Sequence, residues 1–227
     1  TVDDVLYISS KTGLPVVFDN LHNECNPSPS GLSEKELIFQ AFATWRKEDG
    51  RPKIHYSQQA KGKKVRAHTQ TINAEKFYSF FQNLEGLEFD IMLEVKDKNR
   101  SAIKISVLLS NDHKEAEREW ARYKYLVLGK SQKTYNEIRE MLKDKEHFSS
   151  FGFYKLIDDS LELAEDRKKE VNALEHIWGY FKKCATDKEK VNFKSLLQDY
   201  IHGKTSLDKL KSYLKKLAIK YNESYLL

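Results

Sequence analysis

Hydrophobic and polar positions alternate between two patterns in residues 1–113. A continuous apolar run, typical of a strand buried on both faces, lies at Pro15–Asp19, and further β-like runs lie at Pro52–Tyr56 and Phe89–Val95. Apolar positions with helical spacing follow each run, beginning after Ser33, over Ala74–Leu84 and over Asn99–Leu109. This β-α-β-α-β-α order predicts an α/β fold with a parallel sheet and right-handed crossovers.

The first of these helices has a clear start signal. Ser33 suits an N-cap, and Glu36 three residues later completes a capping box in front of the apolar positions of Leu37–Trp45. The segment before it, Cys25–Gly31, is polar and contains proline, so we expect a loop there.

Residues 114–227 contain no convincing strand pattern and predict an all-α region. Amphipathic helices are expected at Glu115–Leu128, Gln132–Leu142, Asn172–Lys183, Lys188–Ile201 and Ser206–Tyr221, with Gly129, Gly152 and Gly203 as breaks. The change of pattern near Asn111–His113 predicts two domains, at residues 1–112 and 113–227.

Composition excludes several classes of protein. The chain of 227 residues is 40% hydrophobic, enough to bury a sizeable core, so wholesale disorder is excluded. No stretch approaches the roughly 20 apolar residues of a membrane helix, and no signal-like start is present. Two distant cysteines exclude a disulfide framework and favour the cytoplasm. Because Thr1 starts inside a helical pattern, we expect a fragment or a processed product.

Charge is distributed unevenly. The net charge is +5, and the whole excess lies in residues 114–227, because acidic and basic residues balance in residues 1–113. Around Tyr123–Tyr125, and at Lys130 and Lys133, basic and aromatic residues mix as they do on nucleic-acid surfaces. The alternative is a helical bundle with aromatic core positions and a solvated exterior, and His176 and His202 are interpreted as structural.

Each apolar run ends in residues that a core would not select. Asp19 closes the first, with His22 three residues later; Lys53 and His55 share one side of the second; and Glu94 lies near the end of the third. In a β/α barrel these carboxyl ends converge on one mouth. Carboxylates and imidazoles together suit Mn²⁺, Zn²⁺ or Fe²⁺, which can polarise a phosphate and activate water.

Taken singly, each residue has an ordinary explanation. Asp19 could cap a helix, His55 could be a hydrogen-bonded core histidine, and Glu94 could belong to a surface ion pair. Lys53 inside a strand is costly to bury unpaired. It could pair with a carboxylate, contact a substrate phosphate, be modified to an anion that binds metal, or reach solvent along its aliphatic stem from the entrance of the strand.

Four ordered motifs resemble the UV-damage endonucleases over residues 1–109. They are the D-x-x-H pair Asp19–His22 after an apolar run, the P-K-x-H-x-S strand Pro52–Ser57, the histidine loop Arg66–Thr69, and the D-[IV]-M-x-E-x-K strand Asp90–Lys96. The helical half, with motifs around Trp120–Gln132 and Asn172–Lys183, resembles the YbgA-like domain, a bacterial family of uncertain function.

The endonuclease resemblance implies the last three βα units of a TIM-type β/α barrel with several divalent ions in its mouth, Mn²⁺ before Zn²⁺ or Mg²⁺. It implies that Asp19, His22, His55 and Glu94 bind metal and that Lys53 and His68 are catalytic. The implied activity is hydrolysis of damaged double-stranded DNA 5′ to UV photoproducts, which starts excision repair. It implies no membrane partner and identifies no partner for the helical half.

Other functions stay open at this point. A sugar isomerase of the same superfamily would use similar residues at a barrel mouth, and a non-catalytic DNA- or partner-binding module belongs to a different class. Three parallel strands cannot close an eight-stranded barrel, so we expect the 227 residues alone to be inactive.

Overall fold

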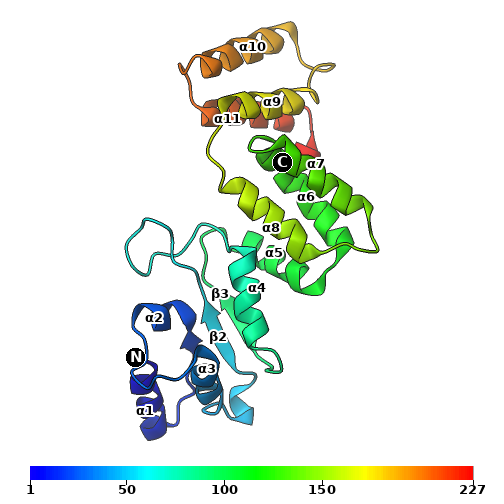
Figure 1. The fold of residues 1–227 in the computed structure, drawn as a ribbon. Helices are drawn as coiled ribbons and strands as arrows, with labels where there is room; N and C mark the ends of the chain where they lie inside the picture. Colours follow the sequence, from blue (N-terminus) through cyan, green and yellow to red (C-terminus); the bar gives the residue numbers. More distant parts are fainter. Residues whose placement is uncertain (227) are drawn as a thin grey trace. The chain divides into compact units, whose positions relative to one another are not determined.

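The computed structural model describes residues 1–226 and divides into two compact units (Figure 1). The first unit, Thr1–Leu109, is called the α/β unit, and the second, which begins at Ser110, is called the helical unit. The observed fold is three parallel strands with helices followed by a helical region, which confirms the predicted fold class.

The α/β unit alternates short strands with helices. Its strands are β1 (Phe18–Asp19), β2 (Lys53–Tyr56) and β3 (Asp90–Leu93), in the sheet order β1-β2-β3 with both pairs parallel. Its helices are α1 (Val2–Thr12), α2 (Asn20–Cys25), α3 (Glu34–Phe42), α4 (Ala74–Asn83) and α5 (Asn99–Ser110), with a short 3-10 turn at Lys47–Asp49. The parallel order therefore follows the prediction.

The core of the α/β unit covers one face of its sheet. Ile54 and Tyr56 of β2 are buried, and Tyr56 packs against Phe77 and Phe80 of α4 with ring centroids 5.1 and 4.7 Å apart. The alternate residues Lys53 and His55 are only half-buried. The second face of the sheet therefore leaves polar side chains accessible. The expected burial of Pro15–Asp19 on both faces was wrong, because Val17 is exposed between the buried Val16 and Phe18.

Several element boundaries also differ from the sequence expectations. Pro15–Val17 lies outside β1, and Val17 is exposed, because only Phe18 and Asp19 pair with β2. The helix α2 (Asn20–Cys25) directly follows β1, since Asp19 caps it, and the expected loop Cys25–Gly31 starts at the last residue of this helix. The predicted start of α3 is confirmed: Ser33 and Glu36 form the capping box, with Ser33 N–H donating to Glu36 Oε2 over 2.7 Å.

The helical unit consists of helices and short turns in its described part. These are α6 (His113–Leu128), α7 (Gln132–Lys143), α8 (Ser150–Leu161), α9 (Arg167–Trp178), α10 (Asp187–Ile201) and α11 (Leu207–Lys220), with a 3-10 turn at Ser224–Leu226. Trp178 stacks on Phe193 at 4.3 Å between ring centroids, inside a core shared by α9, α10 and α11.

Two expectations for this unit were wrong. Gly152 does not break a helix but lies in the first turn of α8, where its N–H donates to the Ser149 cap over 3.1 Å. The helix expected at Asn172–Lys183 begins at Arg167, because Asp166 caps it, and ends at Trp178. In the described residues no helix has the length and apolar character needed to span a bilayer.

Candidate metal centre

Three polar side chains meet at the carboxyl ends of the three strands. Asp19 is the last residue of β1, His55 is its register partner in β2, and Glu94 follows directly after β3. One potential ligand atom from each of them lies within 4.8 Å of the others. Because parallel strands end at the same edge of a sheet, residues far apart in sequence become neighbours here.

Glu94 is the centre of this group. Its Oε1 lies 3.0 Å from His55 Nδ1, and its Oε2 lies 3.6 Å from His68 Nε2. The side chains of His55 and Glu94 are 30% and 29% exposed, so solvent or a ligand can reach them. His68 arrives from the loop after β2, where it forms an antiparallel bridge with Gln59. The two imidazoles therefore face one carboxylate.

Asp19 has two roles in the geometry. Its Oδ1 accepts the backbone N–H of His22 over 2.9 Å, which makes it the N-cap of α2. Its carboxylate also belongs to the group with His55 and Glu94. The capping explanation is therefore correct without excluding the metal explanation, since a carboxylate has two oxygens with several acceptor directions.

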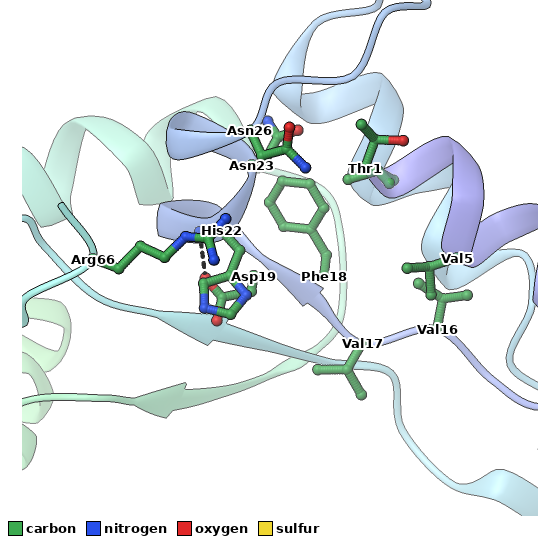
Figure 2. Close-up of a pocket in the computed structure, with 11 residues that line it drawn as sticks. Thr1, Val5, Val16, Val17, Phe18, Asp19, His22, Asn23, Asn26 and Arg66 are labelled. Carbon is green, nitrogen blue, oxygen red and sulfur yellow. Dashed lines mark hydrogen bonds between the residues drawn. The ribbon is translucent and has the colours of Figure 1, made fainter.

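His22 is not a member of this group of three. His22 lies in the first turn of α2, is exposed, and is absent from the group within 4.8 Å. It lines a pocket of about 190 Å³ together with Asp19 and Arg66. Figure 2 shows the Arg66 side chain reaching across this pocket toward His22 and Asp19.

Lys53 lies at the other end of β2, as its first residue. It shares the face of His55, pairs in register with Asp90 and is half-buried. Its ammonium lies 6.0 Å from the centre of the Trp45 ring, and no ion pair of Lys53 occurs within residues 1–226. The position corresponds to the entrance of the strand.

Sequence reasoning overlooked the residue that fixes β1 beside β2. The Asn20 side chain donates to Ser57 O over 2.9 Å and accepts from Ser57 N–H over 2.8 Å, and both residues are buried. These two bonds join the strand ends next to Asp19 and His55. A buried amide directly after a strand-end aspartate was the available signal.

On the opposite face, Tyr56 is excluded from proton transfer near neutral pH. Burial, with smaller contributions from Glu34 and Glu24, raises the pKa of Tyr56 to about 12, although a hydrogen bond from Gln58 opposes the shift. The phenol therefore stays neutral and contributes to packing.

The three ligand candidates fit a divalent metal ion. Two carboxylates and one imidazole are a donor set used for Mn²⁺, Fe²⁺ and Zn²⁺. The side chains come from separate strand ends of a sheet, which fixes their spacing more firmly than a single loop would. Asp19, His55 and Glu94 thus form a group that could hold a metal.

Comparison with known families divides the chain into two parts. Residues 1–120 match the UV-endonuclease UvdE family, and residues 124–227 match a family described as a protein of unknown function (DUF1722). The two matches agree with the expected succession of an endonuclease-like region and a helical region of uncertain function.

Individual relatives carry the same name. A UV DNA damage endonuclease of Clostridium perfringens is 34% identical over 226 residues, which are 97% of this chain and 52% of that protein. One from Bacillus mycoides is 32% identical over 113 residues, covering 49% of this chain and 35% of that protein. The crystal structure of SacUVDE is 44% identical, with a TM-score of 0.43, over 48% of this chain and 36% of that one. The chain thus spans about half the length of the Clostridium perfringens protein and about a third of the length of the other two.

Proposed function

This chain belongs to the UV-endonuclease UvdE family, and on that premise we propose that it contributes a metal centre to a DNA endonuclease acting 5′ to UV photoproducts. The observation that carries the proposal is the meeting of Asp19, His55 and Glu94 within 4.8 Å at the ends of three parallel strands. The proposed substrate is damaged double-stranded DNA, and the proposed process is excision repair.

The proposal concerns a protein longer than the part seen here. Since the chain covers 52% of the Clostridium perfringens relative, we propose that residues 1–112 supply the last three βα units of a TIM-type barrel and that residues 113–227 form a separate helical domain. Three strands leave the sheet open at its edges. The 227 residues alone are therefore proposed not to cleave DNA.

The metal proposal rests on the donor set. Asp19, His55 and Glu94 would hold a divalent ion, with Mn²⁺ preferred over Zn²⁺ or Mg²⁺ and more than one ion in the complete barrel. Such an ion, when bound, polarises a phosphate oxygen and lowers the pKa of water. His22 remains a proposed further ligand, although its side chain lies outside the group of three.

The remaining proposed roles belong to Lys53 and His68. His68 lies 3.6 Å from Glu94, where it can orient that carboxylate or exchange a proton near the phosphate. Lys53 is two residues before His55 on the same face, so a phosphate above the sheet could reach its ammonium. Both are proposed as catalytic residues.

A cleavage assay tests the function. The protein expressed from its complete reading frame is incubated with Mn²⁺ and a duplex that contains one pyrimidine dimer. We expect a single nick immediately 5′ to the dimer and none in the undamaged duplex. Turnover of an aldose without a nick would instead assign the site to a sugar isomerase.

A non-catalytic DNA- or partner-binding module is the second candidate. The accessible face of an open three-stranded sheet favours it, because the described residues supply only part of a barrel. Retained DNA binding without any nick in the same assay would select this alternative. Both candidates place the protein in the cytoplasm, in keeping with the free Cys25 and Cys184.

A further inference from the structure

The loop between β2 and α4 carries a dense group of positive charges. Four of the six residues in Lys61–Arg66 are basic and none is acidic, and all six are exposed. The basic residues are Lys61, Lys63, Lys64 and Arg66. Figure 1 shows the segment as part of the long cyan loop after β2. Residues 61–66 are called the basic loop below.

The charges of the basic loop have no counterions in the part of the chain that the structure describes. Among residues 1–226, none of its four cations lies within ion-pair distance of a carboxylate. By contrast, Arg51 in the same unit lies 3.8 Å from Asp90. Because acidic and basic residues balance over residues 1–113, this is a local concentration and not a consequence of a basic protein. An uncompensated cluster of this kind attracts an external polyanion.

The loop is held in a defined shape by Gln59. The Gln59 side chain donates to Lys64 O over 3.0 Å and accepts the N–H of Arg66 over 2.7 Å. Ala60 and Ala67 close the base of the loop with a backbone hydrogen bond of 2.7 Å. The cations are therefore displayed from a closed loop rather than from a free chain.

The C-terminal end of this loop lies next to the candidate metal centre. His68, two residues after Arg66, lies 3.6 Å from Glu94, and Arg66 lines the pocket of Asp19 and His22 (Figure 2). Arg66 has φ of +67°, a left-handed conformation that costs free energy in a residue with a side chain. The bond from its N–H to Gln59 holds this conformation, which directs the guanidinium to the pocket.

We propose that the basic loop binds the DNA backbone beside the scissile bond, with Lys61, Lys63 and Lys64 on flanking phosphates and Arg66 on the phosphate nearest the metal centre. Lysines act as point charges on successive phosphates, whereas the planar guanidinium suits two oxygens of one phosphate. The proposed function is needed only to say which phosphates the loop holds, namely those beside the scissile bond. Binding of this kind is independent of base sequence, so it would position the duplex while other contacts select the lesion.

Salt-dependent binding tests the loop. The protein expressed from its complete reading frame is titrated into a fluorescent undamaged duplex, and the affinity is measured by anisotropy between low and moderate salt. In a Lys61→Ala, Lys63→Ala, Lys64→Ala triple variant we expect the negative slope of log affinity against log salt to become shallower by about 2 to 3. The affinity at moderate salt should fall roughly 100-fold.

Two matched variants show whether a weaker affinity comes from the loss of charge in the basic loop itself. A Lys11→Ala, Lys35→Ala, Lys47→Ala variant removes the same charge from exposed positions of the same unit and should change the slope little. Replacing the three loop lysines with arginine keeps the charge and should retain binding. If the alanine loop variant binds like the control variant, the inference is overturned.

The cleavage assay separates the inference from the proposed function. With the dimer-containing duplex and Mn²⁺, the alanine loop variant should raise KM and leave kcat nearly unchanged, because its contacts do not touch the reacting atoms. If the wild type nicks the DNA and the alanine loop variant has the same KM, the role of the basic loop is overturned and the proposed function stands. Loop-dependent binding without any wild-type nick would overturn the proposed activity and support the loop as a phosphate-binding element.

Discussion

The two units use charged side chains in opposite ways. In the helical unit, Glu189 accepts hydrogen bonds from Lys220 and Tyr221, each over 2.6 Å, and from its own cap residue Thr186. In the α/β unit, the groups around Glu94 are themselves potential metal ligands, His55 and His68. The Glu189 carboxylate joins α10 to the end of α11, whereas the Glu94 carboxylate lies among side chains that could hold a metal.

The same contrast explains the basic and aromatic residues of the helical unit. Lys124 lies over the rings of Tyr225 and Tyr125 at 3.9 and 4.5 Å, and Lys130 donates to Leu163 O over 2.9 Å. Burial raises the pKa of Tyr125, so its hydroxyl remains a neutral donor to Tyr180 over 3.1 Å. These residues have hydrogen-bond or ring partners within the helical unit, unlike the cations of the basic loop. The contrast favours the helical-bundle explanation of this pattern.

Replacing Lys53 gives the largest expected effect. If its ammonium contacts the phosphate in the transition state, Lys53→Ala in the protein from the complete reading frame lowers the cleavage rate by roughly two to three orders of magnitude. Metal content, measured by plasma emission, should be nearly unchanged, whereas His55→Ala should lose metal and activity together.

The other results for Lys53→Ala are equally specific. Loss of bound metal in this variant would support a modified, metal-binding lysine. Wild-type cleavage would leave only the explanation that Lys53, the first residue of β2, reaches solvent from the strand entrance.

Replacing Asn20 tests whether the site depends on the strand ends being fixed. Asn20→Ala leaves the buried N–H and C=O of Ser57 without their side-chain partner. We expect a loss of about 2–4 kcal/mol in the stability of the α/β unit, since each unsatisfied buried group costs about 1–3 kcal/mol. Urea unfolding followed by Trp45 fluorescence in a variant without the other two tryptophans measures this loss.

Asn83→Ala is the matched control for Asn20→Ala, because Asn83 is the exposed last residue of α4. Its unfolding curve should overlay that of the parent protein. Equal destabilisation by both substitutions would contradict the positioning role of Asn20.

Replacing Glu189 tests the helical unit and has the smallest expected effect of the three replacements. Hydrogen bonds from Lys220, Tyr221 and Thr186 lower the pKa of Glu189 to about 2. Because this value lies below the usual 4.5, the ionised carboxylate stabilises the fold above about pH 4.5, and the stabilisation is lost as the pH falls toward 2. In Glu189→Gln, thermal unfolding should therefore depend less steeply on pH in this range.

The control for Glu189→Gln is Glu175→Gln, at an exposed position on α9. Circular dichroism between pH 2 and 6 records the midpoints of all three proteins. Parallel curves for the wild type and Glu189→Gln would show that these bonds do not contribute to the acid dependence.

The order of elements was predictable because strong local signals specify it. The capping box at Ser33 marks the start of α3, and the strand expected at Pro52–Tyr56 differs from β2 by one residue. The helix α8 was missed because Gly152 suggested a break, while Ser149 caps the helix three residues earlier in the chain. Burial of only one face of the sheet depends on which helices pack on it, and a single strand sequence does not contain that information.

The candidate site was predictable in type and only partly in geometry. Asp19, His55 and Glu94 meet because equivalent strand ends converge, a consequence of the parallel topology. His22, in the first turn of the helix α2 that Asp19 caps, is not a member of this group of three. The roles assigned to Lys53 and His68 came from family motifs and stay predictions until the variants are measured.

Binding of Mn²⁺ to the protein from the complete reading frame tests the metal centre most directly. Equilibrium dialysis compares the wild type with Asp19→Asn, His55→Gln and Glu94→Gln, and with a control carrying Asp144→Asn and His147→Gln, whose native side chains form a 3.0 Å pair in the helical unit. We expect each α/β substitution to reduce the Mn²⁺ bound per chain and the control to retain it. Full retention in all three site variants would contradict a metal centre at these strand ends.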